Sequence, residues 1–460
     1  MRARWRRHML VAAFASAVAL VGPGIGSAAV SSAAAGSPGS APGSVLWTSV
    51  HAAEGHAVAV DPRGGMVFVA GSAGLVAYDA ATGATLWDNS GGPGRSVAVT
   101  PNGRIVLVIK PRRTSGGGSD YLTSAFDTAT GKRLWVRRYN GRANGVDIPT
   151  ALAVSPDGRA VFVTGTSKGK TSGRDYATVA YAAATGRQLW VSRYNGRGRS
   201  LDVPVAIAVS LRGGPVFVTG SSSGRESGLD FATVAYAVGT GATLWTKRYD
   251  AADGVDEASS VAVSPNGRRV FVAGASEGRK PGLDFSTVAY AATTGTPLWV
   301  RRYHGPTERH DIPGAVLVSP RDGGTVIVAG ASAGHGNNDF VSVAYNNVTG
   351  RTKWVSRVHR AFQPEFLAAA AISHDGRSFY LTGYVFPGGG GGEEPSDALT
   401  VAAKVLTGAQ RWAKVITPSS GNTNAIGISV AVSPDSGSVY SVVQNFTTSP
   451  TDFSTIAFRA

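Results

Sequence analysis

Aspartate residues recur at regular positions along the chain, and carboxylates in such a pattern could bind a cation or the hydroxyls of a sugar. One set precedes an apolar segment in four successive repeats: Asp147 in GVDIP, Asp202 in SLDVP, Asp256 in GVDEA and Asp311 in RHDIP. If the repeats surround an axis, these side chains form an arc at one end of a central channel. The alternative, which the sequence favours, is that each carboxylate accepts hydrogen bonds from its own turn.

Two further polar sets recur. A second aspartate opens a strand in seven repeats, which favours a structural role: Asp120, Asp175, Asp230, Asp284, Asp339, Asp397 and Asp452. Arginine and tyrosine are adjacent in four repeats, where they could grip an acidic or sugar ligand or stack between repeats: Arg138 and Tyr139, Arg193 and Tyr194, Arg248 and Tyr249, Arg302 and Tyr303.

Two segments break the repeat. HGPTERHD (304–311) holds His304, His310 and Asp311, which are residue types that ligate metals, but no second cluster follows at a suitable spacing. FPGGGGGEEPSD (386–397) lacks the Lys-Ser/Thr ending of a phosphate-binding loop and is interpreted as a surface loop. No Gly-x-Ser-x-Gly elbow stands out for nucleophilic catalysis.

One tryptophan marks each repeat, and the repeats supply the strands that must position these residues. We interpret the tryptophans as structural residues that dock each unit onto its neighbour. They are Trp47, Trp87, Trp135, Trp190, Trp245, Trp299, Trp354 and Trp412. One unit contains four short segments with strand character, 150–156, 160–165, 175–181 and 188–194, each bounded by turn residues. Such a sheet must be covered by its neighbours. The sequence therefore predicts an all-β, eight-bladed β-propeller with four-stranded antiparallel blades.

The ends of the repeat region complement each other. Residues 452–460 resemble a third strand with no fourth after it, whereas residues 43–50 resemble a fourth strand with nothing before it. We expect the ring to close by pairing the N-terminal strand with the C-terminal three strands, because this pairing removes open sheet edges. A glycine lies four residues before each tryptophan, as expected for a turn with positive φ.

The segments AYDAATGATLW (77–87) and AFDTATGKRLW (125–135) resemble the tryptophan-docking repeat Ala-x-Asp-x-x-Thr-Gly-x-x-x-Trp of the quinoprotein alcohol dehydrogenase-like, or PQQ-like, propellers. That family includes dehydrogenases using pyrroloquinoline quinone (PQQ) and non-enzymatic outer-membrane assembly lipoproteins. The resemblance implies, for an enzyme, adjacent cysteines over the quinone and Glu, Asn and Asp around calcium. This chain has no cysteine, and no such trio aligns. We expect no cofactor, with PQQ and calcium as the alternative.

The first residues have the pattern of a signal peptide. An arginine-rich start, MRARWRRHML, precedes the apolar run VAAFASAVALVG, which is too short to span a bilayer. Arg6 and Arg7 partly resemble a twin-arginine export signal. We predict a signal peptide at residues 1–28, a small-residue linker at 29–43 and the propeller at 44–460, with no membrane span. The predicted location is secreted and extracellular.

The formal net charge of the whole chain is +15, and the excess is scattered over the repeats. No recognition pattern supports specific nucleic-acid binding. We expect a monomeric, non-catalytic binding or interaction module for an extracellular polymer, a cell-surface component or a protein. The alternative is an enzyme, either a quinone-dependent dehydrogenase or a propeller lyase or hydrolase that acts on sugars.

Overall fold

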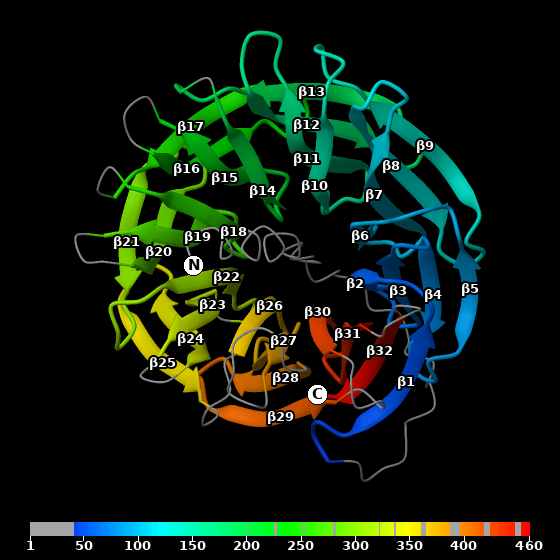
Figure 1. The fold of residues 1–460 in the computed structure, drawn as a ribbon, viewed down its shortest axis with the longest axis vertical. Coiled ribbons are helices and arrows are strands. Elements are labelled where there is room, and N and C mark those ends of the chain that lie inside the picture. The colour runs from blue at the N-terminus through cyan, green and yellow to red at the C-terminus, as the bar shows by residue number, and fades with distance from the viewer. Residues whose placement is uncertain are drawn as a thin grey trace.

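The computed structural model describes residues 41–460 except 199, 225–227, 252–253, 279–281, 322, 335–336, 360–364, 387–395, 418–423 and 447–451. The predicted signal peptide and most of the predicted linker lie outside the described residues, as does most of the glycine-rich segment 386–397. The described chain forms eight four-stranded antiparallel sheets arranged around an axis, and it contains no helix (Figure 1). This confirms the predicted eight-bladed propeller.

Each blade except the closing one takes four consecutive strands, of which the first is innermost in the ring (Figure 1). The first three such blades are β2 (Gly55–Val60), β3 (Met66–Gly71), β4 (Leu75–Asp79) and β5 (Thr85–Asn89); β6 (Ser96–Val99), β7 (Ile105–Arg113), β8 (Ser119–Asp127) and β9 (Arg133–Tyr139); and β10 (Asp147–Val154), β11 (Ala160–Lys168), β12 (Arg174–Ala182) and β13 (Gln188–Tyr194).

The next four blades continue the same order around the ring. They are β14 (Asp202–Val209), β15 (Val216–Ser223), β16 (Leu229–Tyr236) and β17 (Thr243–Tyr249); β18 (Asp256–Val263), β19 (Arg269–Glu277), β20 (Leu283–Ala291) and β21 (Pro297–Tyr303); β22 (Asp311–Val318), β23 (Thr325–Ala333), β24 (Asn338–Asn346) and β25 (Thr352–Val358); and β26 (Glu365–Ile372), β27 (Ser378–Val385), β28 (Asp397–Lys404) and β29 (Gln410–Ile416).

The eighth blade closes the ring with strands from both ends of the described chain. Its order is β1 (Val45–His51), β32 (Asp452–Arg459), β31 (Ser438–Phe446) and β30 (Asn424–Val432). β1 and β32 are antiparallel, and Thr48 pairs with Ile456. Figure 1 shows this blue strand beside the red one. The predicted closure by one N-terminal and three C-terminal strands is confirmed.

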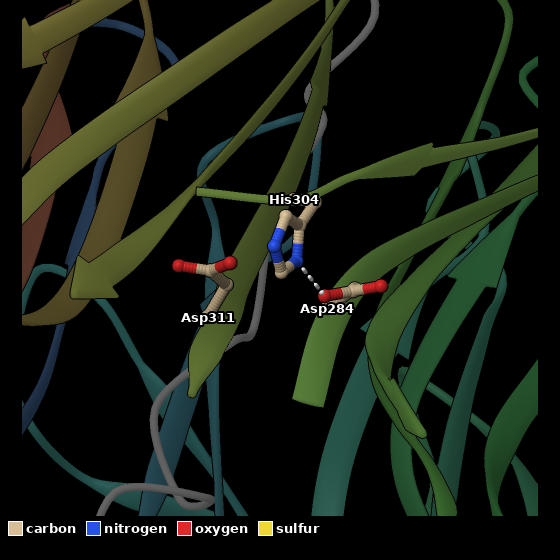
Figure 2. Close-up of side chains that lie close together, drawn as sticks. All are labelled: Asp284, His304 and Asp311. Atoms are coloured by element: carbon tan, nitrogen blue, oxygen red, sulfur yellow. Dashed lines mark hydrogen bonds and ion pairs between the residues drawn. The ribbon is translucent and has the colours of Figure 1, made fainter. Parts of the chain in front are cut away.

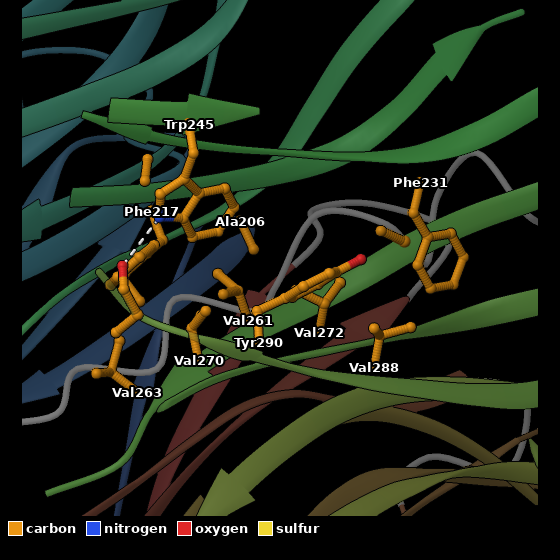
Figure 3. Close-up of a cluster of buried hydrophobic side chains, with 14 residues drawn as sticks. Ala206, Phe217, Phe231, Trp245, Val261, Val263, Val270, Val272, Val288 and Tyr290 are labelled. Atoms are coloured by element: carbon orange, nitrogen blue, oxygen red, sulfur yellow. Dashed lines mark hydrogen bonds between the residues drawn. The ribbon is translucent and has the colours of Figure 1, made fainter. Parts of the chain in front are cut away.

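The tryptophans lie between blades, each over the turn glycine of the next blade, and we call this contact the tryptophan dock. Trp245 donates its indole N–H to the carbonyl of Ala292 at 2.9 Å. A Cβ atom on Gly295, whose φ is +68°, would lie 2.6 Å from the indole. Glycine is therefore required here for both its conformation and its missing side chain. Figure 3 shows this dock within a cluster of buried side chains from two neighbouring blades.

The closing blade repeats the dock with Gly43, the last residue of the predicted linker. Its φ is +78°, and a Cβ atom on it would lie 2.8 Å from the Trp412 ring. The backbone N–H of Gly43 also donates to the carbonyl of Arg459 at 2.8 Å. The ring is therefore joined across its closure by the same packing of tryptophan on glycine, although the Trp412 indole N–H has no hydrogen-bond partner among the described residues.

Candidate functional site

The four aspartates predicted as an arc occupy the first positions of β10, β14, β18 and β22, so these strands begin earlier than the sequence suggested. None is more than 1% exposed. Each carboxylate accepts a hydrogen bond from a backbone N–H of the preceding turn: Asp147 from Gly141 at 2.6 Å, Asp202 from Gly196 at 2.7 Å, Asp256 from Ala251 at 2.9 Å and Asp311 from Gly305 at 2.6 Å. All four carboxylates are therefore buried and hydrogen-bonded to their own turns.

The burial of these carboxylates has an electrostatic cost. Burial raises the pKa of Asp202, Asp256 and Asp311, because the charged form loses its water. Hydrogen bonds from the preceding turn act in the opposite direction. A second carboxylate beside each adds to the rise, and for Asp311 this neighbour is Asp284.

The arginine and tyrosine pairs join neighbouring blades. Arg193 donates to Asp175 at 2.8 Å and to the Ser167 hydroxyl at 2.6 Å, both within its own blade. It also donates to the phenol of Tyr139 in the preceding blade at 3.1 Å. Arg248 and Arg357 repeat this arrangement with Tyr194 and Tyr303. These guanidinium groups are therefore engaged in the structure.

The residue after each arginine and tyrosine pair approaches the start of the next blade, and its chemistry changes from blade to blade. It is Asn140, Asn195, Asp250, His304 and, after a valine, His359. At two junctions this residue completes a group of three potential metal ligands whose ligand atoms all lie within 4.8 Å of one another. We name these groups the His304 cluster (Asp284, His304 and Asp311) and the Asp250 cluster (Asp230, Asp250 and Asp256).

Figure 2 shows the imidazole of His304 between the carboxylates of Asp284 and Asp311. His304 Nδ1 and Asp284 Oδ1 are 2.8 Å apart. The sequence had grouped His304 and Asp311 with His310, but His310 Nδ1 instead accepts the backbone N–H of Leu283 at 3.2 Å. Asp284, the third member of the cluster, was assigned to a structural set and was missed. The signal that could have identified it is the constant separation between the strand-opening aspartate and the residue after the pair, as in Asp120 and Asn140.

The outermost strands carry a different feature, a β-bulge in every blade. The residue immediately before each tryptophan has no cross-strand partner, as Leu189 shows between the paired residues Gln188 and Trp190. In six successive blades this residue is a leucine at least 36% exposed; we call these residues the leucine row: Leu46, Leu86, Leu134, Leu189, Leu244 and Leu298. In the other two blades it is Lys353 and Arg411.

The arginines of the described blades offer no ready site for the carboxylates of PQQ at three junctions. The quinone carries carboxylates and would need available cationic groups or a bound calcium ion. The guanidinium groups of Arg193, Arg248 and Arg357 are bonded to aspartates, so these three cations are already paired. The chain also has no cysteine to cover the cofactor. We therefore derive no redox step.

Comparison with known proteins places these features in context. The family described as outer membrane protein assembly factor BamB matches residues 37–178, 157–336 and 230–445. No curated protein matches the chain. In the described residues, no helix could serve as a membrane span.

Solved structures share the fold at low sequence identity. BamB from Moraxella catarrhalis is 14% identical, with a TM-score of 0.53 over 91% of this chain and 99% of that one. A quinohemoprotein alcohol dehydrogenase from Comamonas testosteroni is 14% identical, with a TM-score of 0.59 over 90% and 76%. A second one, from Pseudomonas putida HK5, is 13% identical, with a TM-score of 0.54 over 89% and 76%.

Proposed function

Because the chain belongs to the PQQ-like β-propeller family described as outer membrane protein assembly factor BamB, we propose that it is a secreted, non-catalytic module that binds a protein partner. The family description supports a protein as the partner, since it names an assembly factor. The pattern of residues 1–28 supports export. Mass spectrometry of the N-terminus of protein recovered outside the cells would test export, and an intact Met1 would contradict it.

The observation that carries the proposal is the leucine row. The residue at the bulge is an exposed apolar side chain in six neighbouring blades. Bulges also interrupt the hydrogen-bonding edge of a strand, which hinders strand addition by another chain. A partner would therefore contact the side chains of the row rather than extend a sheet.

The chemistry of the row favours a protein over a polysaccharide. Its members are aliphatic, and aliphatic side chains gain free energy by excluding water from another apolar surface. Sugar hydroxyls need hydrogen-bonding groups, which a leucine lacks. Lys353 and Arg411 interrupt the row in two adjacent blades. The change from apolar to basic residues would determine where around the ring a partner binds.

Site-specific photo-crosslinking in the cells that produce the protein would test the proposal. A photoreactive residue at Leu189 or Leu244 should yield one protein adduct of defined mass. A matched probe at Leu406, which is 77% exposed but lies outside the row, should not yield it. Loss of the Leu189 adduct when Leu134 and Leu244 are changed to Arg would support the row as the contact. Equal adducts from Leu189 and Leu406 would overturn it.

The competing dehydrogenase function is tested separately. Purified protein would be titrated with PQQ and Ca²⁺ while tryptophan fluorescence and dye reduction by alcohols and sugars are measured. We expect neither saturable quenching nor substrate-dependent dye reduction. Both together would replace the proposed function by a quinone-dependent activity.

A further inference from the structure

Asp311 is a buried carboxylate with an unused oxygen. The residue is 0% exposed, and its Oδ2 atom accepts the backbone N–H of Gly305 at 2.6 Å. Its Oδ1 atom has no hydrogen bond of ordinary geometry, although Ser332 lies beside it. Within the described part of the chain, Asp311 takes part in no ion pair. Buried carboxylates are normally paired or bound to a metal, so this oxygen calls for a positive partner.

Asp284 also has a carboxylate whose two oxygens have different partners: one accepts from an arginine and the other faces His304. Arg302 donates to its Oδ2 atom at 2.9 Å, and His304 Nδ1 lies 2.8 Å from its Oδ1 atom. A contact such as that from Arg302 orients a metal ligand, because it fixes the carboxylate through one of its oxygens. A cation between Asp284 and His304 would replace the direct contact of Oδ1 with the imidazole. His304 is 32% exposed, so the cluster is open to solvent on the histidine side.

We propose that Asp284, His304 and Asp311 bind a divalent transition-metal cation of the zinc class, with water completing its coordination. Zinc takes nitrogen and oxygen ligands at about 2.0–2.2 Å, which requires ligand atoms about 3–3.5 Å apart. The three ligand atoms lie within 4.8 Å of one another, so binding requires the partly exposed imidazole to move a short way from its contact with Asp284. The cation would tie the blade β18–β21 to the blade β22–β25.

The neighbouring junction shows why the histidine matters. The Asp250 cluster has the same three positions but offers only carboxylate oxygens, a set that suits Ca²⁺ or Mg²⁺. Imidazole nitrogen suits zinc, copper and nickel. Two other junctions carry Asn140 and Asn195 at this position. His359 holds this position at the following junction, 2.9 Å from Asp339 Oδ1, but that pair belongs to no such group of three among the described residues. The zinc preference is therefore assigned to the histidine of the one complete group, and it does not depend on the protein-binding function proposed above.

The test is calorimetric titration of tag-free, metal-stripped mature protein with Zn²⁺. We expect one saturable site, and His304→Asn should lower its affinity at least about tenfold, since a lost contact even one shell beyond the ligands costs 10–100-fold. Asn is the residue that the chain itself uses at two equivalent positions, so this variant should fold. Asp250→Asn, the matched change in the neighbouring cluster, should leave the affinity unchanged.

Co²⁺ gives a second readout that does not depend on affinity alone. Its visible absorption should change when it enters a site with a nitrogen ligand, and His304→Asn should abolish that change. Absence of saturable Zn²⁺ binding to the wild-type protein would overturn the proposal. Equal Zn²⁺ binding by wild type and His304→Asn would also overturn it, because the metal would then be held by other groups.

Discussion

The tryptophan dock and the His304 cluster both lie between neighbouring blades, toward opposite ends of the outermost strands, and they differ in what they allow to vary. Trp245 is buried over a glycine of the next blade, and the same pair of residue types recurs around the ring. The residue after the arginine and tyrosine pair is asparagine, aspartate or histidine. The repeat therefore keeps the same residue types where packing is closest. It varies the residue type where one side of the junction remains open to solvent.

The largest effect is expected at the dock itself. Trp245→Ala should lower the free energy of unfolding by about 3–5 kcal/mol, since it removes a large buried side chain and leaves a cavity. His304→Ala should cost less than about 1 kcal/mol, because that side chain is partly exposed. Denaturant unfolding measures both. Equal losses would break the distinction between the two regions.

A series of glycine substitutions separates the two demands of the dock. Gly295→Ala should destabilise most, because it combines a φ of +68° with a Cβ contact of 2.6 Å to Trp245. Gly213→Ala isolates the conformational cost, about 1 kcal/mol, since its φ is +69° and nothing lies within 4 Å. Gly239→Ala has neither problem. Thermal unfolding should rank them in this order, and a loss at Gly239 as large as that at Gly295 would contradict it.

The pH dependence of stability should sharpen the account of the His304 cluster. The raised pKa of Asp311 means that the folded state holds its proton more tightly than the unfolded state does. The resulting penalty is fully present above the folded pKa and is relieved as pH falls toward about 3.9, the ordinary value. The stability of the wild type relative to Asp311→Asn should therefore rise on acidification. A difference that is constant with pH would contradict this.

The smallest effect is expected in the leucine row. Leu244→Lys should change the free energy of unfolding by less than about 0.5 kcal/mol, because the side chain is 49% exposed. Lys353 already occupies the equivalent bulge in another blade. Thermal unfolding checks the stability, whereas crosslinking from Leu189 checks whether partner contact is weakened. A large loss of stability would show that the row serves the core.

Much of the fold could be predicted because the repeat displays it many times. Trp190 and its equivalents marked the blades, and the strand-like segment 452–460 without a successor predicted the closure. The bulge at Leu189 could not be predicted, because it depends on pairing register: Gln188 and Trp190 find partners while the residue between them does not. The proximity of Asp284 and His304 could not be predicted for a related reason. It depends on how the third strand of the blade, β20, and the end of its fourth strand, β21, approach the next blade.

The pairing of Thr48 with Ile456 joins residues more than 400 positions apart. A contact between such distant residues is slow to form, because it requires closure of a very long loop. Until β32 is available, β1 has no partner and the ring keeps two unprotected edges. A chain cut short before β32 would therefore remain open to proteases and to edge-to-edge aggregation. The closing blade thus makes the stability of the whole ring against proteolysis and aggregation depend on synthesis of the chain through β32.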